Sequence, residues 1–254
     1  MDALDPIRSQ PGRAGIFTDF DGTLSEIAPT PGEAVAVPGA REALEALAGM
    51  YDLVAVISGR RAADVASLLG RPAGVRWFGL YGLEVEGGPV DPMAETLLER
   101  VTELLPEVEA VAALVPGAMV EPKGLQVAVH YRAVSDPDGA ARLLRERLDP
   151  IAGRAGLRVL EGKKVLELAP ERGSTKGDVV ERTTRARAHR AILYAGDDLA
   201  DREAFAAVER LRAEGVAGVT IAVRSAETPE ELVDRADLVV DGPGELVRVM
   251  GMLT

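Results

Sequence analysis

The sequence predicts an α/β protein in which a parallel-sheet core is interrupted by an inserted α+β cap. In the first and last parts of the 254-residue chain, strand-like apolar runs alternate with helix-like stretches, which is typical of a parallel sheet covered on both faces. In the middle part, apolar and polar residues alternate with a period of two, which is typical of a sheet with one exposed face. We therefore place the core at residues 1–84 and 171–254, and the cap at residues 85–170.

The first core segment contains three predicted strands and two predicted helices. An apolar run over 15–20 predicts the first strand, and the continuous apolar run over 53–57 predicts a buried strand. Between them, Pro38 suits the first turn of a helix, and the apolar residues that follow share one face, so we expect a helix over 38–50. The segment ends with a short helix and a short strand, expected at 62–69 and 75–78.

The predicted cap combines helices with strands of alternating pattern. Apolar residues share one helix face over 92–105 and again over 138–151, which predicts two amphipathic helices. Residues 125–131 alternate with a period of two, which predicts a half-exposed strand. Two more short strands, with turn residues between them, are expected at 157–160 and 165–168.

After Pro170 the strand–helix alternation returns, and these elements are expected to complete the parallel sheet. The expected elements are a helix at 177–188, a strand at 191–195, a helix at 201–213 and strands at 219–223 and 238–240.

The composition excludes several classes of function. With a net charge of −12, the chain lacks the positive charge that non-specific electrostatic binding to nucleic acid or to an anionic membrane needs. It has no cysteine, which excludes disulfides, thiolate metal sites and cysteine nucleophiles, and its two histidines are too few for a multi-histidine zinc site. Any bound metal is therefore expected to be a hard cation held by oxygen atoms.

We expect neither a targeting segment nor a membrane segment in this sequence. No apolar run approaches the roughly 18 residues that a membrane span needs. The first 15 residues contain no apolar signal-peptide core, and we expect them to form a short mobile lead. We therefore expect a cytoplasmic, soluble protein with neither membrane nor nucleic acid as a partner.

Single aromatic and histidine side chains carry simpler expectations. Trp77, the only tryptophan, and Tyr131, on an alternating strand, are expected in the core. His189 precedes a strand and is expected at the surface. His130 fits a packing role and a binding role equally well.

Two carboxylates, Asp19 and Asp21, stand at the end of the first predicted strand. They lie at its carboxyl end, which is the edge of a parallel sheet where ligands bind. Their spacing allows one carboxylate to attack an electrophile while the other handles a proton. Gly22 allows a sharp turn, and Thr23 adds a hydroxyl. A solvated loop would contain the same residue types. The functional interpretation of this motif therefore depends on the three further motifs described next.

The turn Ser58-Gly59-Arg60 follows the buried strand at 53–57, again at its carboxyl end. The hydroxyl of Ser58, backbone donors exposed beside Gly59, and the guanidinium of Arg60 suit a phosphate group. A turn that only caps the next helix would look the same.

Lys176 stands at the start of a predicted helix, after Gly173-Ser174-Thr175. A lysine at this position can neutralise a carboxylate and a phosphate together. The stretch resembles a fragment of a P-loop, but the spaced glycine and the hydroxyl after the lysine are missing, so we reject a nucleotide P-loop.

Three carboxylates, Asp197, Asp198 and Asp201, crowd the end of the predicted strand at 191–195. They repel one another unless a divalent cation lies between them. Helix capping by Asp198 and a favourable interaction of Asp201 with the helix dipole explain part of this cluster.

In these four motifs the chain resembles phosphatases of the haloacid dehalogenase superfamily. The matching pieces are Asp-Phe-Asp-Gly-Thr at 19–23, Ser58, Lys176 and Gly-Asp-Asp at 196–198. The resemblance implies a Rossmann-like core of the haloacid dehalogenase type with an inserted cap.

The resemblance also implies a role for each matching residue. Asp19 would be the nucleophile that forms an aspartyl-phosphate, and Asp21 would protonate the leaving group and then activate water. Ser58 and Lys176 would hold the phosphoryl group. Mg²⁺ would be the cofactor, with Asp19, Asp21 and Asp197 as ligands. Asp198 is a further candidate ligand, and the choice between Asp198 and Asp201 in the metal shell stays open.

Within this superfamily the chain is similar to the trehalose-6-phosphate phosphatases. The stretches that match are at 17–29, 57–60, 79–84, 121–124, 130–132 and 162–170. The chain departs from that pattern at Tyr81, where histidine is more common, and at Ala169, where arginine is more common.

By this resemblance the cap binds the sugar. The expected contacts to sugar hydroxyls are Glu121, Lys123, Arg132, Lys163 and Glu167, and Lys164 takes the place of Lys163 if the register shifts by one. An ordinary charged strand face is the alternative explanation for these residues.

The expected function is Mg²⁺-dependent hydrolysis of trehalose 6-phosphate, with a functional link to a trehalose-phosphate synthase. Alternatives are a phosphatase for sucrose 6-phosphate or a mannosyl-phosphoglycerate, and a weakly active domain that binds a synthase partner. A phospho-accepting signalling module is disfavoured because such domains are about half this length and lack a cap.

Overall fold

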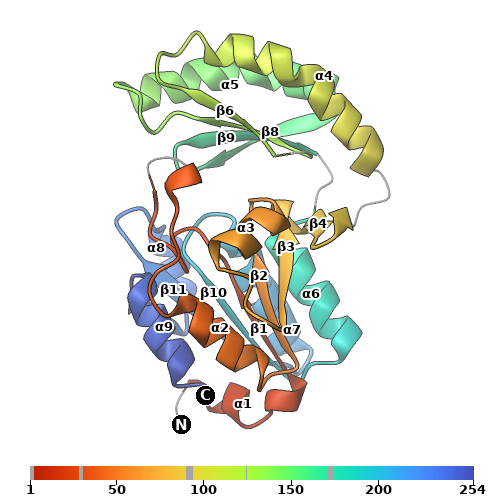
Figure 1. Cartoon of the computed structure of the whole chain (residues 1–254), viewed down its shortest axis with the longest axis vertical. Helices are drawn as coiled ribbons and strands as arrows, with labels where there is room; N and C mark the ends of the chain where they lie inside the picture. Colours follow the sequence, from red (N-terminus) through yellow and green to blue (C-terminus); the bar gives the residue numbers. More distant parts are fainter. Residues whose placement is uncertain (1–2, 29–30, 90–93, 124, 171–173) are drawn as a thin grey trace. The chain divides into compact units, whose positions relative to one another are not determined.

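The computed structural model describes residues 3–28, 31–89, 94–123, 125–170 and 174–254. The chain forms two compact units, residues 1–88 with 174–254 and residues 89–173 (Figure 1). These divisions fall a few residues after the predicted boundaries at 84 and 170.

The first unit contains an eight-stranded sheet in the order β12-β11-β10-β1-β2-β3-β4-β5. Its strands are β1 (Ala14–Thr18), β2 (Leu53–Ile57), β3 (Val75–Gly79), β4 (Glu84–Val85), β5 (Gly88–Pro89), β10 (Ala191–Gly196), β11 (Ala217–Arg224) and β12 (Leu238–Asp241). The six long strands pair in parallel, and β4 runs antiparallel to β3. Every residue of β1, β2 and β10 is buried, because both faces of the sheet are covered.

Helices cover both faces of this sheet (Figure 1). One face packs against α1 (Asp5–Arg8), α2 (Ala40–Ala48), α3 (Ala62–Leu68) and α9 (Pro243–Gly251), and the other against α6 (Lys176–Arg187), α7 (Asp201–Ala213) and α8 (Glu230–Arg235). Three 3₁₀ turns also belong to this unit: η1 (Pro11–Arg13), η2 (Pro31–Glu33) and η3 (Leu80–Gly82). The three-layer α/β core predicted from the alternating pattern is confirmed.

The second unit is an antiparallel sheet with helices on one face, as Figure 1 shows. The strands lie in the order β6-β7-β9-β8 and comprise β6 (Met119–Pro122), β7 (Val127–His130), β8 (Leu157–Gly162) and β9 (Val165–Pro170). The helices α4 (Ala94–Ala112) and α5 (Pro137–Arg154) pack on the face that carries Val127, Val129, Leu166 and Leu168. The other face carries the alternate residues, including Glu121, His130 and Glu167.

Several elements differ from their prediction. Helix α4 continues through Pro106 to Ala112, beyond the predicted end at 105, while the predicted start at 92 lies outside the described residues. The strand β6 and the helices α1, α8 and α9 were absent from the prediction, because each is short or lacks a clear apolar period.

The prediction of a mobile N-terminal lead is wrong. Leu4 and Ile7 are fully buried in the core of the first unit, and Ile7 belongs to α1, which anchors the segment. Arg8 Nε donates to the carbonyl of Met252 at 3.0 Å, which ties this segment to the end of α9. Its apolar residues are too few to form a periodic pattern, which is why the sequence did not reveal it.

The predictions for the aromatic residues are confirmed, and the prediction for His189 is wrong. Trp77 and Tyr131 are buried in the cores of the first and second units. The His189 side chain is fully buried, and its Nε2 lies 2.9 Å from Asp52 Oδ2. A buried histidine paired with a carboxylate cannot be distinguished from a surface histidine by its position before a strand.

Among the described residues, no helix is both long enough and apolar enough to cross a membrane.

Candidate active site

The order of the strands reverses beside β1, at the carboxyl edge of the first unit's sheet. From β1 the chain proceeds to β2 and β3 on one side, and after the second unit it returns to β10, β11 and β12 on the other side. In open α/β sheets, ligands bind outside the strand ends at such a point of reversal. Asp19 follows β1, Asp197 follows β10, and the backbone N–H of Asp19 donates to the carbonyl of Ala195 at 2.9 Å.

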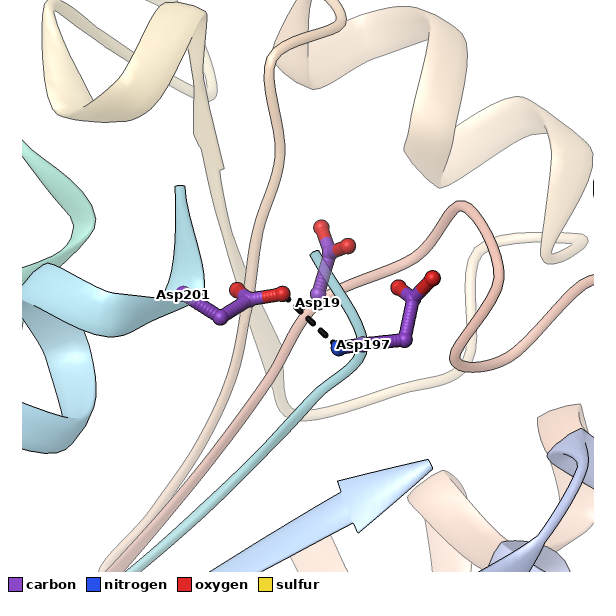
Figure 2. Close-up of side chains that lie close together, drawn as sticks. All are labelled: Asp19, Asp197 and Asp201. Carbon is purple, nitrogen blue, oxygen red and sulfur yellow. Dashed lines mark hydrogen bonds between the residues drawn. The ribbon is translucent and has the colours of Figure 1, made fainter. Parts of the chain in front are cut away.

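Three buried carboxylates meet at this edge. Asp19, Asp197 and Asp201 each offer one oxygen, and these oxygens lie within 4.8 Å of one another. Figure 2 shows the Asp19 carboxylate between those of Asp197 and Asp201, with Asp201 turned toward the backbone nitrogen of Asp197. The structure therefore brings the first and fourth predicted motifs together.

Lys176 is the buried cation of this cluster. Its Nζ lies 3.0 Å from Asp19 Oδ1 and 2.7 Å from Asp201 Oδ1. It is the first residue of α6, whose start is fixed by a reciprocal capping box between Thr175 and Asp178. The next residue, Gly177, lies so close to α7 that a Cβ there would be 2.3 Å from the carbonyl oxygen of Glu203. The close packing of the two helices thus sets the position of Lys176.

Asp201 anchors the loop rather than facing an open site. Its Oδ1 accepts hydrogen bonds from Lys176 and, at 2.6 Å, from the hydroxyl of Tyr194. Its Oδ2 accepts the backbone N–H groups of Asp197 at 2.8 Å and of Asp198 at 2.9 Å. Four donors therefore occupy the two oxygens of this carboxylate.

The turn after Asp21 holds Asp197 in place. Gly22 has a φ of 80°, and a Cβ at this position would lie 2.2 Å from Asp197 Oδ2, so only glycine fits. The hydroxyl of Thr23 donates to Asp197 Oδ1 at 2.9 Å. The glycine and the hydroxyl singled out in the sequence thus both act on the carboxylate that follows β10.

The electrostatics of the cluster follow from burial and crowding. Burial raises the pKa of Asp19 well above its usual range, Lys176 lowers it, and the neighbouring carboxylates raise it further. Burial acts to lower the pKa of Lys176, but the attraction of Asp19 and Asp201 outweighs this and raises the pKa well above its usual range. Lys176 is therefore a cation under all ordinary conditions.

The donor set fits a hard divalent cation. Asp19 and Asp197 present buried carboxylate oxygens close together, and oxygen is the ligand atom that Mg²⁺ prefers. A cation between them would offset the mutual repulsion that raises the pKa of Asp19. Because the oxygens of Asp201 already accept four hydrogen bonds, the fit depends on Asp19 and Asp197.

Asp198, the other predicted metal candidate, has a different environment. Its side chain is about a quarter exposed, and its Oδ1 accepts the backbone N–H of Ala200 at 2.8 Å. Lys176 Nζ lies 3.9 Å from the same oxygen. Asp198 therefore closes the turn before α7, but it is not the helix cap that the sequence predicted, because the N-cap position is Ala200 and no side chain caps this helix.

The predicted phosphate-binding turn lies at the same edge of the sheet. Ser58 is buried, and its hydroxyl accepts the backbone N–H of Arg60 at 3.1 Å. The guanidinium of Arg60 binds Asp21 through two hydrogen bonds, of 2.8 and 2.7 Å. The structure thus joins Arg60 to the second carboxylate of the first motif.

The second unit gathers its predicted residues on the sheet face opposite α4 and α5. Lys123 Nζ lies 2.6 Å from Glu167 Oε1 and 3.9 Å from Glu121 Oε2, and both Lys123 and Glu167 are buried. His130 Nε2 lies 2.7 Å from Glu121 Oε2, so His130 joins this group.

The other two predicted sugar contacts lie at the β8–β9 hairpin. Arg132 Nη2 donates to the carbonyl of Lys163 at 2.8 Å. Lys164, the alternative to Lys163, has a φ of 59° and places its Nζ 3.7 Å from Asp138 at the start of α5. The two lysines of the turn therefore differ in backbone conformation, and Lys164 is paired with the helix.

Sequence reasoning missed Tyr194 as a member of the active-site network. A fully buried tyrosine needs a partner for its hydroxyl, and Tyr194 lies on β10 two residues before Gly196. Because this position is so close to the acidic motif, the sequence could have indicated that the Tyr194 hydroxyl binds one of its carboxylates.

Comparisons with known proteins agree with this geometry. Residues 17–236 match the family model for trehalose-phosphatase. The trehalose-phosphate phosphatase of Mycobacterium marinum is 34% identical over 260 residues, which cover 95% of this chain and 61% of that protein. An uncharacterized glycosyl hydrolase of Mycobacterium tuberculosis is 38% identical over 226 residues, which cover 85% of this chain and 16% of that protein. The chain thus spans less than two thirds of the length of these relatives.

Solved structures support the fold. The C-terminal domain of trehalose-6-phosphate phosphatase from C. albicans superposes with a TM-score of 0.81 at 20% identity, covering 99% of this chain and 95% of that chain. A haloacid dehalogenase-like hydrolase from Bacteroides thetaiotaomicron superposes with a TM-score of 0.62 at 15% identity, covering 95% and 99%. The fold is of the haloacid dehalogenase type, as predicted, and with the match over 17–236 the chain belongs to the trehalose-phosphatase family.

Proposed function

We propose that this protein is a Mg²⁺-dependent phosphatase that hydrolyses trehalose 6-phosphate to trehalose and inorganic phosphate. The observation that carries the proposal is the buried cluster of Asp19, Lys176 and Asp197 at the reversal point of the sheet. Such a cluster combines a nucleophile, a cation and a hard-metal ligand within reach of one phosphoryl group. Membership of the trehalose-phosphatase family supports the choice of substrate.

In this proposal Mg²⁺ would be held by Asp19, Asp197 and the backbone carbonyl of Asp21, with Asp198 as a fourth candidate. When bound, it would offset negative charge on the phosphoryl oxygens, which otherwise repels an attacking carboxylate. Lys176 supplies a second, permanent positive charge, with its Nζ 3.0 Å from Asp19 Oδ1.

In the first step, a carboxylate oxygen of Asp19 attacks phosphorus in line with the sugar oxygen. The bond between phosphorus and the sugar oxygen breaks, and its electron pair stays on that oxygen, which takes the proton of the Asp21 carboxyl. The products of this step are trehalose and an aspartyl-phosphate at Asp19.

In the second step, the Asp21 carboxylate takes a proton from water, and the water oxygen attacks phosphorus. The bond between phosphorus and Asp19 breaks with its electrons returning to the carboxylate, which releases inorganic phosphate. Asp21 is then protonated again, as at the start of the cycle. Ser58, the backbone beside Gly59, and Lys176 hold the phosphoryl oxygens throughout.

The sugar is proposed to bind residues of the second unit. Glu121, Lys123 and Glu167 form a group of alternating charge, and each member can pair with neighbouring hydroxyls of a polyol. Arg132 and Lys163 add donors at the adjacent hairpin. A trehalose-phosphate synthase would then be the natural source of the substrate.

The test is phosphate release with Mg²⁺ from trehalose 6-phosphate, glucose 6-phosphate, sucrose 6-phosphate and mannosyl-phosphoglycerate. We expect a strong preference for trehalose 6-phosphate that is lost when the metal is chelated. Preference for another ester would keep the phosphatase assignment and make Tyr81 and Ala169 the first candidates for altered specificity. Inactivity on all four, with stable binding to a synthase, would replace the catalytic role with a binding role.

A further inference from the structure

Arg60 makes an unusually complete contact with Asp21. Its Nε donates to Asp21 Oδ2 at 2.8 Å, and its Nη2 donates to Oδ1 at 2.7 Å, so one guanidinium fork binds both oxygens of the carboxylate. The guanidinium carbon also lies 5.7 Å from the ring centre of Phe20. The arginine is thus held by the two residues that directly follow the nucleophile.

The backbone around Arg60 is fixed from both sides. Its N–H donates to the hydroxyl of Ser58, and its carbonyl accepts the N–H of Leu80 at 2.9 Å. The N–H of Tyr81 donates to the carbonyl of Ser58 at 3.0 Å. Leu80 and Tyr81 have φ values of 51° and 56°, which are costly for residues other than glycine and persist only where the surrounding structure enforces them.

Gly59 completes this support. A Cβ at Gly59 would lie 2.8 Å from the ring of Tyr81, so the aromatic ring closes over the turn that presents Arg60. A side chain that only adds charge to the protein surface does not require a strained, tightly packed turn. It suits a side chain whose position must be accurate.

We propose that Arg60 is a positioning residue that acts through Asp21 and orients its carboxyl for proton exchange, rather than a ligand of the phosphoryl group. This inference rests on the proposed function and replaces the phosphate-binding role that the sequence predicted for Arg60.

The exposure of Asp21 explains why it needs such a partner. Its side chain is 41% exposed, so packing alone does not fix the plane of the carboxyl group, whereas Asp19 and Asp197 are buried. A planar fork fixes that plane, and a lysine ammonium, which is a point charge, does not. After Asp21 gives its proton to the sugar oxygen, it is the carboxylate that Arg60 holds at both oxygens and that accepts a proton from water.

The experiment compares two leaving groups in the full chain with Mg²⁺. Arg60→Gln and Arg60→Lys are assayed for kcat/KM on trehalose 6-phosphate, whose sugar oxygen needs a proton, and on p-nitrophenyl phosphate, whose leaving group does not. The parameter kcat/KM covers only the steps up to release of the leaving group, so slow hydrolysis of the aspartyl-phosphate does not mask the comparison. We expect Arg60→Gln to lower kcat/KM about 100-fold on the sugar ester and less than about 3-fold on the aryl ester, with Arg60→Lys close to Arg60→Gln.

A double-mutant cycle with Asp21→Asn gives a second readout. If Arg60 acts through Asp21, Arg60→Gln should have less than about a 3-fold effect on the sugar ester once Asp21 is already an asparagine. The matched control is Arg61→Gln, which removes an exposed arginine next in the sequence and should leave both substrates unchanged. A fall in the thermal midpoint would not by itself produce a difference between the two leaving groups.

The opposite pattern would overturn the inference. Equal losses on both esters, additive effects in the double mutant, and weaker inhibition by inorganic phosphate would make Arg60 a phosphate ligand. The proposed function itself is tested by Asp19→Asn on the same two esters. Loss of activity in Asp19→Asn with a negative result for Arg60 would keep the phosphatase mechanism and reject only the positioning role.

Discussion

The two units present their polar groups in different ways. In the first unit, Asp19, Lys176 and Asp197 come from distant parts of the sequence and meet because parallel strands and a helix end at one edge of a sheet. In the second unit, antiparallel pairing places Glu121 and Glu167 on one sheet face, and Lys123, the residue after β6, pairs with both. The first arrangement is set by the order of the strands, and the second by their register.

Under the proposed function, this difference separates the reaction at phosphorus from the binding of the sugar. A strand edge offers backbone groups, helix ends and side chains around one point, which suits a reacting phosphoryl group. A sheet face offers side chains spread over an area, which suits a sugar with many hydroxyls. We therefore expect changes in the first unit to affect every phosphate ester, and changes in the second unit to affect only the sugar ester.

The largest expected effect follows from Asp19→Asn. An amide cannot serve as the attacking anion, so kcat should fall at least about 1,000-fold on both trehalose 6-phosphate and p-nitrophenyl phosphate. The thermal midpoint, measured with a chelator present, should not fall, because burial and the neighbouring carboxylates disfavour the charge of Asp19 more than Lys176 favours it. Retained turnover would remove Asp19 as the nucleophile.

Two glycines, one in each unit, test whether close packing at Gly177 contributes to stability and activity, with Gly153 as the loosely packed control. Gly177→Ala places a methyl group against the carbonyl of Glu203 and should destabilise the protein by about 1–3 kcal/mol and lower kcat through Lys176. Gly153→Ala in α5 meets nothing within 4 Å and should stabilise the protein by up to about 1 kcal/mol. Chemical denaturation of both variants measures the difference, and similar effects would contradict the packing argument.

Glu167→Gln tests the second unit. Loss of this carboxylate beside Lys123 should raise KM for trehalose 6-phosphate about 10-fold and leave p-nitrophenyl phosphate unchanged. The matched control is Glu161→Gln on β8, since Glu161 pairs with Arg145 of α5 and both side chains are exposed. An equal loss of activity on the aryl ester would show that the second unit does not act on the sugar ester alone.

The smallest expected effect concerns His189, at the amino end of β10. Burial lowers its pKa below the usual 6.5, although the hydrogen bond to Asp52 opposes this. As the pH falls through about 6.5, the unfolded chain therefore binds a proton before the folded chain does, and stability decreases.

Calorimetry between pH 7.5 and 5.5 should therefore show a steeper loss of thermal midpoint in the wild type than in His189→Gln, by about 3 °C or less. The lowered pKa of Asp52 contributes only in more acid solution, as its carboxylate becomes protonated. Equal slopes for the two proteins would show that His189 does not titrate differently on folding.

The active-site edge could be predicted from sequence because its motifs directly follow buried strands. Asp19, Ser58 and Asp197 each stand after a run of apolar residues, and the parallel sheet places the ends of such runs together. Lys176 could be placed because it stands at the start of a predicted helix, after Gly173-Ser174-Thr175. The residue types alone then suggested phosphate chemistry.

Other features depend on contacts that no local pattern contains. The pairing of Arg60 with Asp21 joins two side chains 39 positions apart, and the hydrogen bond from Tyr194 to Asp201 crosses a turn whose shape is set by α7. Strand β6 lacks the alternation expected of a strand because Met119 is exposed and Pro122 ends the strand early. The residues of the second unit were assigned by resemblance, since register cannot be counted from one strand alone.

The insertion of the second unit between β5 and α6 has a consequence for how the chain acquires its structure. The central strand β1 pairs with β10, so residues 14–18 find one of their two neighbours only after about 170 further residues have been made. Contacts so distant in sequence form slowly, and an unpaired strand edge favours association with other chains.

Residues 89–173 form their own hydrophobic core and their own sheet, so they can become ordered before β10 emerges from the ribosome. Once ordered, this unit replaces a flexible loop with a fixed spacer and lowers the entropy lost when the two halves of the large sheet meet. The inserted unit would in this way assist assembly of the sheet whose edge holds the nucleophile.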